Sequence, residues 1–324
     1  MKSLAIWITT ALMLASAVSL SRSSSAQSET KNAASREILV HGHRGARAWR
    51  PENTIPAFQF AIDHGVDVLE LDLAVTKDNV LVVSHNPTLN LNPEHPGERL
   101  CKGPALAPNT AIHDMTLAEV RQYDCGSVPL PGFPKQVAVP GTKVATFDEV
   151  LDLAKGTPAN EKVQFNVETK SFPNHPELTP TPAEFVALIV AAIKKHNVDP
   201  ARIILQSFDW RTLAEMRKQW PAIRLSALVG RPQYDALMGH TAPTKDFAAI
   251  ARETGAEIIS PEWVMVTPEQ VAAAHQAGAQ VAPWTPNTPE QWQKMADANV
   301  DAIISDDPVA LLASLRAQKP PLHP

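Results

Sequence analysis

Short apolar, β-rich segments alternate with helical segments along most of the chain, and this alternation constrains the fold more than any other feature. Eight strands are predicted, at residues 38–43, 67–73, 163–169, 202–207, 224–229, 257–260, 280–284 and 302–305. The predicted helices between and after them are at residues 55–64, 147–154, 182–196, 211–219, 247–254, 268–276, 289–298 and 308–316. Near-continuous apolar strands are typical of a parallel sheet that is buried on both faces. Eight such units predict an α/β fold, the (β/α)₈ or TIM barrel.

The ends of the predicted helices carry residues that favour starting or stopping a helix. Thr267 and Thr288 each stand immediately before a proline, so the threonine can cap the helix and the proline can occupy its first turn. Gly65, Gly255 and Gly278 each lie between a predicted helix and the next predicted strand, where a left-handed residue commonly ends a helix. These signals support the helix boundaries independently of the apolar pattern.

Two segments between the second strand and the second helix depart from the repeating pattern. Residues 80–84 form a further apolar run that begins only seven positions after the second strand ends. A parallel crossover needs more residues, so this run predicts a hairpin with the second strand. Residues 86–143 are rich in Pro, Gly and Asn and predict an inserted, loop-rich lobe over the active face of the barrel. Within this lobe, residues 116–123 predict one helix, with Thr116 as its cap and Glu119 at the capping-box position.

The N-terminus is typical of an exported protein. Lys2 precedes an apolar run at residues 4–18, and Ser24-Ser25-Ala26 provides a small-x-small cleavage pattern. A membrane anchor is the alternative, but a span needs about 20 apolar residues and this run is shorter. We therefore expect a signal peptide at residues 1–26 and a single barrel domain at residues 27–324. The mature protein is then periplasmic or secreted, with no stable membrane anchor.

Charge and cysteine content narrow the possible classes further. The net charge is −5 and no basic block or stripe occurs, which argues against nucleic-acid partners. Cys101 and Cys125 are the two cysteines of the chain, and both lie in the predicted insertion. In an exported chain they can form a disulfide, with two unpaired thiols as the alternative. Their spacing alone does not indicate zinc ligands.

Polar side chains gather at the carboxyl ends of the predicted strands, which is the end of a TIM barrel where active sites lie. In chain order these positions hold His43, Arg44, Glu70, Asp72, His85, Glu168, Lys170 and Trp284. The bodies of the same strands remain apolar. The sequence therefore predicts one polar site at this rim.

The carboxylates at this rim suggest a metal site. Glu70 and Asp72 are two residues apart on one strand, so they share a face, and Glu168 comes from the next barrel strand. Any one of these acids alone would be interpreted as a solvated charge at a strand end. Three converging carboxylates, however, repel one another unless a cation joins them. Oxygen ligands of this kind select Mg²⁺ or Ca²⁺ rather than Zn²⁺.

The basic residues at the rim suit a phosphate ester. Arg44 can hold two phosphate oxygens at once, and Lys170 can supply a point charge. His43 and His85 suit proton transfer because imidazole titrates near neutral pH. The alternative for His85 is a strand-end histidine with a structural hydrogen bond, and that interpretation is preferred for His41.

Taken in order, these residues resemble the glycerophosphodiester phosphodiesterase family. The matching motifs are His43-Arg44-Gly45, Pro51-Glu52-Asn53-Thr54, Glu70-Leu71-Asp72, His85-Asn86, Glu168-Thr169-Lys170, Trp284 and Asp306. The resemblance implies a TIM barrel that hydrolyses glycerophosphodiesters to glycerol 3-phosphate and an alcohol with one divalent cation, Ca²⁺ or Mg²⁺. One residue departs from the family pattern, because Asn86 stands where the family usually has Asp.

The resemblance also implies roles for individual residues. Glu70, Asp72 and Glu168 would hold the metal. His43 and His85 would be the general base and the general acid. Arg44 and Lys170 would bind the phosphate, and Trp284 would pack against the glycerol. Glu52 would anchor the first loop by hydrogen bonds. If the usual Asp has a catalytic part, Asn86 predicts lower activity or a shifted pH optimum.

Two other functions remain open from the sequence. The first is a lysophospholipase D-like or phospholipase C-like enzyme on the same barrel. It would need a membrane-facing apolar surface on the insertion, for which residues 130–134 are the candidate. The second is a binding protein that has lost catalysis. The presence of all the candidate catalytic histidines and metal-binding acids argues against this alternative.

Overall fold

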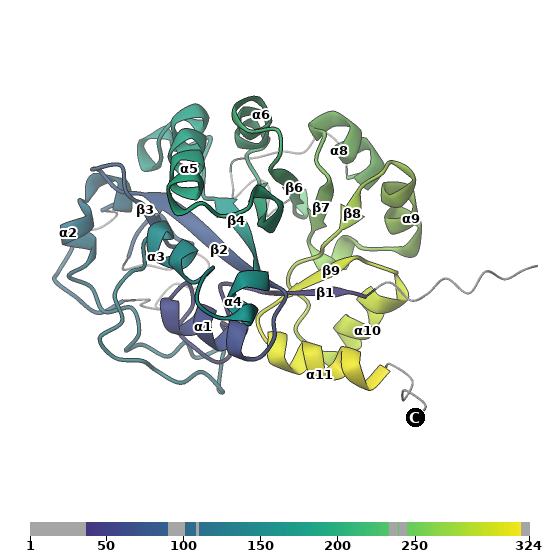
Figure 1. The fold of residues 1–324 in the computed structure, drawn as a ribbon, viewed down its shortest axis with the longest axis horizontal. Coiled ribbons are helices and arrows are strands. Elements are labelled where there is room, and N and C mark those ends of the chain that lie inside the picture. The colour runs from purple at the N-terminus through teal and green to yellow at the C-terminus, as the bar shows by residue number, and fades with distance from the viewer. Residues whose placement is uncertain (1–36, 90–100, 108–109, 233–238, 240–244, 319–324) are drawn as a thin grey trace, which may run out of the picture. The chain divides into compact units, whose positions relative to one another are not determined.

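The computed structural model describes residues 37–89, 101–107, 110–232, 239 and 245–318. The predicted signal peptide at residues 1–26 lies outside the described residues and stays a prediction. Within the described residues, the chain from Glu37 onward forms the barrel and its inserted lobe (Figure 1).

In the described part of the chain, nine strands form one sheet. They are β1 (Leu39–Gly42), β2 (Val68–Val75), β3 (Leu81–Val83), β4 (Gln164–Thr169), β5 (Ile203–Ser207), β6 (Arg224–Val229), β7 (Ile258–Pro261), β8 (Gln280–Val281) and β9 (Ala302–Ser305). Eight of them pair in parallel, in the order β8-β7-β6-β5-β4-β2-β1-β9. Strand β3 pairs antiparallel with β2, as the predicted hairpin requires. The predicted TIM barrel is confirmed.

Strand β8 is shorter than the predicted strand at residues 280–284. Pro283 has no backbone N–H, so it cannot donate to a regular ladder there. The chain nevertheless stays beside its neighbours, because Trp284 makes isolated parallel bridges to Glu262 and to Ile304 of β9. These bridges bring the two ends of the strand order together and close the barrel.

Helices cover the outside of the strands (Figure 1). They are α1 (Ile55–Asp63), α2 (Leu117–Val120), α3 (Phe147–Asp152), α4 (Pro158–Lys162), α5 (Pro182–His196), α6 (Trp210–Gln219), α8 (Phe247–Thr254), α9 (Pro268–Gln276), α10 (Pro289–Asp297) and α11 (Pro308–Gln318). Short 3₁₀ turns are η1 (Ile112–Asp114), η2 (Pro176–Leu178), η3 (Pro200–Arg202) and η4 (Trp263–Met265). Thr267 and Thr288 cap α9 and α10 as predicted, because each side chain accepts a hydrogen bond from the first turn.

Helix α5 shows how the outer helices attach to the barrel. The stretch Pro176–His196 is long and apolar enough to cross a membrane by length and composition alone. Its Phe185, Ile189 and Ile193 side chains recur at helical spacing and are buried in the main core. This apolar face therefore packs on the strands.

The inserted lobe has its own small core. Cys101 and Cys125 form a disulfide within it. Ile112, Val120 and Tyr123 pack with residues of β2 and β3. The predicted helix at residues 116–123 is shorter in the structure, where α2 spans Leu117–Val120 and begins with the expected capping box. The lobe is thereby joined to the hairpin side of the barrel.

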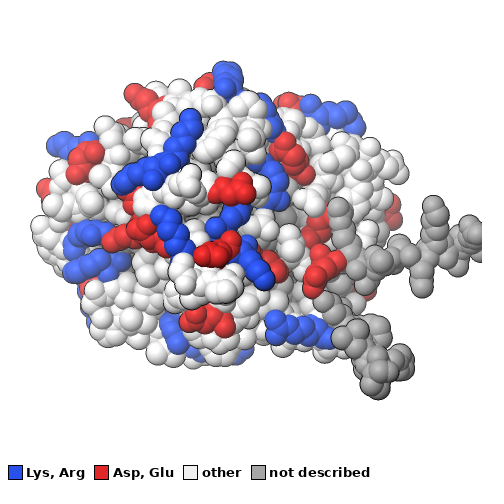
Figure 2. Space-filling model, in the orientation of Figure 1, with Lys and Arg blue, Asp and Glu red and all other residues white. Residues whose placement is uncertain are grey.

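Charged residues are distributed without a dominant sign on the visible surface. Figure 2 shows Lys and Arg side chains intermixed with Asp and Glu side chains on one face.

Candidate active site

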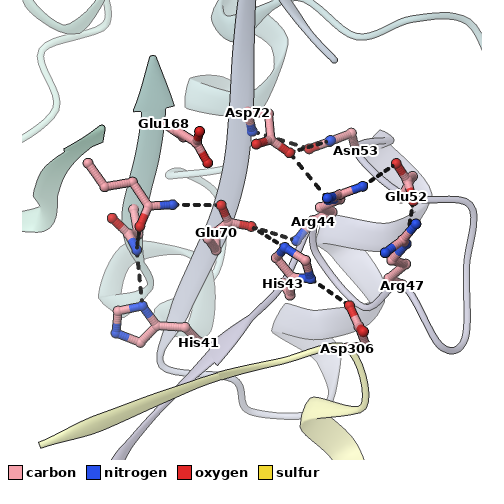
Figure 3. Close-up of polar contacts among 12 residues, drawn as sticks. His41, His43, Arg44, Arg47, Glu52, Asn53, Glu70, Asp72, Glu168 and Asp306 are labelled. Atoms are coloured by element: carbon pink, nitrogen blue, oxygen red, sulfur yellow. Dashed lines mark hydrogen bonds and ion pairs between the residues drawn. The ribbon is translucent and has the colours of Figure 1, made fainter. Parts of the chain in front are cut away.

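The loop that follows β1 bends back toward β2. Arg44 has a left-handed backbone with φ of 51°, and its N–H donates to Glu70 Oε2 at 2.8 Å. The Arg44 side chain donates to Glu52 Oε1 at 2.8 Å, and its Nε lies 3.5 Å from Asp72 Oδ2. Glu52 also pairs with Arg47, so one carboxylate holds two guanidinium groups (Figure 3). The loop is therefore fastened to the strand that carries the acids.

Three carboxylates converge beside this loop. Glu70, Asp72 and Glu168 are buried, and each offers an oxygen within 4.8 Å of the others. Asp72 and Glu168 are register partners on the paired strands β2 and β4, and Glu70 lies two residues before Asp72 on the same face. The structure thus brings the three acids together, as their spacing in the sequence predicted.

The carboxylates resist ionising together. Burial, and then the charges of Asp72 and Glu168, raise the pKa of Glu70 well above its usual value. Burial and the Asp72 charge raise the pKa of Glu168 to about 7, against the lowering effect of Lys170. Burial acts in the same direction on Asp72, but the cationic groups around it outweigh burial and lower its pKa. A further positive charge would therefore favour the state in which all three acids are ionised near neutral pH.

The donor set fits a hard divalent cation. Asp72 Oδ1 is buried and accepts no hydrogen bond from the described residues, and Lys170 Nζ lies 3.9 Å away. Burying a carboxylate oxygen that has no hydrogen-bond donor costs free energy unless a cation or another partner binds it. Clustered carboxylate oxygens are the ligands that Mg²⁺ and Ca²⁺ prefer. Glu70, Asp72 and Glu168 could hold such an ion.

Lys170 lies beside the acids. Its Nζ donates to Glu168 Oε1 at 2.9 Å, and the side chain is almost fully buried. It does not line the cavity described below, whereas Arg44 does. Its predicted contact with a substrate phosphate stays a prediction.

His43 is held between two acids. Its Nδ1 lies 2.5 Å from Asp306 Oδ1, and its Nε2 lies 3.9 Å from Glu70 Oε2. Burial acts to raise the pKa of Asp306, but the charge and hydrogen bond of His43 outweigh it and lower that pKa. Asp306 is thus an ionised acceptor, which places the proton on Nδ1 and leaves Nε2 facing Glu70.

His85 lies at the end of the hairpin and is also buried. Its Nδ1 lies 2.8 Å from Asn86 Oδ1, which can accept the Nδ1 proton. Burial lowers the pKa of His85 well below its usual value, and the charges of Arg44 and Lys170 add to this effect. The side chain at position 86 therefore orients the ring without adding a charge.

A cavity of about 210 Å³ joins most of these side chains. Its polar lining includes His43, Arg44, Arg47, Glu70, His85, Glu168 and Gln206. Its apolar lining includes Phe208, Leu228 and Trp284, which pack together, with the Phe208 and Trp284 rings edge to face at 5.7 Å. The cavity thus combines a charged region with an aromatic surface.

Four contributing residues were missed as site residues by the sequence reasoning. Asn53 donates to Asp72 Oδ2 at 2.9 Å, and Gln206 donates to Glu70 Oε1 at 2.7 Å. Arg47 lines the cavity, and Asp306 holds His43. Asn53 and Asp306 belong to the motifs that resemble the family, and this membership could have identified them as site residues. Gln206 is a polar residue inside an apolar strand, which is a weaker indication of a role in the site.

The chain matches a known family over most of its length. Residues 43–310 match the model of the glycerophosphoryl diester phosphodiesterase family. A glycerophosphodiester phosphodiesterase from Caldanaerobacter subterraneus subsp. tengcongensis is 30% identical over 284 residues, covering 86% of this chain and 98% of that protein. One from Bacillus subtilis is 27% identical over 278 residues, with 84% of each chain covered.

Solved structures share this fold. A structure from Silicibacter pomeroyi DSS-3 assigned to glycerophosphoryl diester phosphodiesterases has a TM-score of 0.76 and 32% identity, covering 87% of this chain and 94% of that one. A phosphodiesterase from Oleispira antarctica, solved with the product sn-glycerol-3-phosphate, has a TM-score of 0.66 and 20% identity, covering 86% and 96%. The chain therefore belongs to the glycerophosphodiester phosphodiesterase family and is a phosphoric diester hydrolase.

Proposed function

We propose that this enzyme hydrolyses glycerophosphodiesters to glycerol 3-phosphate and an alcohol, with one Ca²⁺ or Mg²⁺ held by Glu70, Asp72 and Glu168. The observation that carries the proposal is the convergence of these three carboxylates beside a single cavity, which Glu70 and Glu168 line together with the two histidines and Arg44. The product found in the Oleispira antarctica phosphodiesterase supports the same chemistry.

The charged residues would bind the phosphate and stabilise the transition state. When bound, the cation supplies Lewis-acid stabilisation of the phosphate oxygens. Arg44 lines the cavity and offers a guanidinium to the same oxygens, while its own position is fixed by Glu52. Lys170 donates to Glu168 and lowers the cost of keeping that acid ionised. We propose that its positive charge also acts on the phosphate, although its side chain lies beside the acids and not in the cavity lining.

The two histidines would move the protons. His43 keeps Nδ1 on Asp306, so its Nε2 is the base that removes a proton from the nucleophile, either water or the neighbouring glycerol hydroxyl. His85 is the acid that protonates the leaving alkoxide. Burial, and then the charges of Arg44 and Lys170, lower the pKa of His85. A negative substrate offsets those two charges, which raises the pKa again and favours the protonated form of His85 in the complex.

The aromatic part of the cavity would receive the carbon atoms of the substrate. Trp284 is held by a hydrogen bond from its Nε1 to Ser260 O at 2.9 Å and packs with Phe208 and Leu228. A rigid apolar surface beside polar groups is typical of small-molecule sites. We infer that Trp284 packs against the glycerol.

The lipid-directed alternatives receive little support from the insertion. Among residues 130–134, Leu130 is buried, and the Phe133 ring is covered by the Arg47 guanidinium at 4.8 Å. In the described part of the chain, the large apolar side chains that are well exposed are Val137 and Val264. This segment therefore lacks the apolar surface that a membrane-acting enzyme would need.

Export is part of the proposal. A disulfide between Cys101 and Cys125 suits an oxidising compartment, and the N-terminal pattern predicts cleavage after Ala26. The enzyme would act on glycerophosphodiesters outside the cytoplasm. Sequencing the N-terminus of the protein recovered from periplasm and medium tests this, since an uncleaved N-terminus would contradict it.

A chelator-controlled assay tests the proposed reaction. Pure enzyme is freed of metal with EDTA and assayed with glycerophosphocholine and glycerophosphoethanolamine, before and after adding Ca²⁺ or Mg²⁺. We expect release of glycerol 3-phosphate only with metal. His85→Ala should abolish turnover, while His175→Ala, at an exposed histidine outside the cavity, should not. If no glycerol 3-phosphate is released with Ca²⁺ and none with Mg²⁺, the proposal is overturned and a binding protein is favoured.

A further inference from the structure

A series of buried hydrogen bonds crosses the barrel interior and ends on Glu70. Gln206 on β5 donates from Nε2 to Glu70 Oε1 at 2.7 Å. Asn166 on β4 donates from Nδ2 to Gln206 Oε1 at 2.8 Å. The same Asn166 nitrogen lies 3.4 Å from His41 Nδ1, so the contacts join His41 to Glu70 (Figure 3). All four side chains are at most 2% exposed, so water cannot easily replace any of these partners.

When Glu70 is a carboxylate, the donor and the acceptor of each hydrogen bond in the series are fixed. A carboxylate only accepts, so Gln206 must turn its NH₂ group to Glu70 and its carbonyl away. That carbonyl then needs a donor, which Asn166 provides. The second N–H of Asn166 faces His41 Nδ1, which can accept because burial, with the charge of Arg224, lowers the pKa of His41 to about 3. Each amide thus fixes the orientation of the next.

Both oxygens of Glu70 are held by donors from opposite sides. The backbone N–H of Arg44 donates to Oε2 at 2.8 Å, and Gln206 donates to Oε1. A carboxylate with both oxygens held cannot rotate away from its neighbours. Hydrogen bonds of this kind set the orientation of metal-binding side chains.

We propose that Gln206 is a positioning residue that holds Glu70 in the orientation required for metal binding, with Asn166 fixing the Gln206 amide. This inference rests on the proposed metal site. Gln206 also lines the cavity, but its donor group is directed to Glu70. Gln206 therefore acts through the acid it holds.

Calorimetric titration of Mg²⁺ and Ca²⁺ into chelator-treated protein tests the proposal. Gln206→Met keeps the side-chain length and removes the amide. It should weaken metal affinity by about 10- to 100-fold, with the melting temperature of the metal-free protein close to that of wild type. Ser226→Ala is the matched control. Ser226 is the buried register partner of Gln206 on β6 and bonds Ser260 Oγ at 2.8 Å, so its removal should leave affinity unchanged.

Asn166→Leu provides a second variant. It should weaken metal affinity less than Gln206→Met, and the double variant should be no weaker than Gln206→Met alone, because Asn166 acts through Gln206. If wild type binds metal and Gln206→Met binds equally well, this inference is overturned while the metal site stands. If wild type binds no metal, both the inference about Gln206 and the proposed metal site are rejected. If Gln206→Met does not fold, Asn166→Leu decides, and unchanged affinity there would overturn the inference.

Discussion

His43 Nδ1 lies 2.5 Å from Asp306 Oδ1, although the two residues are 263 positions apart in the chain. Strands β1 and β9 pair in parallel with Gly42 opposite Ser305, so the next residue of each strand is brought to the same place. An Asp306→Asn variant should lower kcat by roughly 10²- to 10⁴-fold, because an amide can donate to Nδ1 and stabilise the wrong tautomer of His43. Steady-state kinetics with glycerophosphocholine check this.

Asp307 offers a matched control for that variant. Its side chain accepts from Trp49 Nε1 at 2.8 Å and from Lys135 Nζ at 2.9 Å, and it has no contact with His43 among those described. Asp307→Asn should leave kcat within a few-fold of wild type. Equal kcat values for the two variants would show that Asp306 does not orient the base.

Asn86 gives a prediction about pH dependence. Asn86→Asp places a carboxylate beside His85 Nδ1, which favours the imidazolium and raises the pKa of His85. A general acid is active when protonated, so the alkaline limb of the kcat profile should move to higher pH. Asn86→Leu should lower kcat without that shift. Movement of the acidic limb instead would assign His85 as the base.

Glu168 makes the metal-free protein sensitive to pH. Its pKa rises from 4.5 to about 7 on folding, so the folded state binds a proton that the unfolded state releases. Its contribution to stability is therefore greatest below about pH 4.5 and is lost as pH rises through about 7. Chelator-treated wild type should melt at a lower temperature at about pH 8 than at about pH 6.

The amide variant isolates this effect. Glu168→Gln cannot ionise, so its melting temperature should change less across the same pH range. In wild type the metal replaces the proton, and metal affinity should increase over this range. If the melting temperatures of metal-free wild type and Glu168→Gln change equally with pH, the assignment is contradicted.

Much of the barrel was predictable because a parallel sheet buried on both faces leaves a strong apolar signal. The predicted strand at residues 224–229 and helix at 182–196 coincide with β6 and α5. The meeting of Glu70, Asp72 and Glu168 followed from their spacing and from the rule that barrel sites lie at strand ends. In these cases local pattern and tertiary structure agree.

Features that depend on contacts between distant side chains were not predictable in this way. Helix α4 (Pro158–Lys162) was missed, since five residues give too short a pattern. His196 is buried with its ring nitrogens 2.9 Å from Asp148 and Asp152, which lie more than 40 positions earlier in the chain. The bond from Gln206 to Glu70 joins positions 136 residues apart. No local pattern encodes such a partner.

The disulfide predicts a measurable stability difference. Cys101 and Cys125 are 24 positions apart, and in the chain-entropy model closing a loop of that size stabilises the folded state by about 3 kcal/mol. Cys101→Ser with Cys125→Ser should lower the free energy of unfolding by about that amount, measured with guanidinium. Dithiothreitol should lower the stability of wild type and leave the double variant unchanged. A double variant as stable as wild type would mean that the lobe is held by its other contacts alone.

The lobe is also tied to the first loop by contacts of its own. Gln136 Nε2 donates to Arg47 O at 2.7 Å, and the Val137 N–H donates to Trp49 O at 3.0 Å. Grafting a relative's lobe onto this scaffold would separate these pairs unless the recipient loop were exchanged too. The inserted lobe and the first loop thus form one structural unit. A change of head-group preference by lobe exchange would require both segments to be exchanged together.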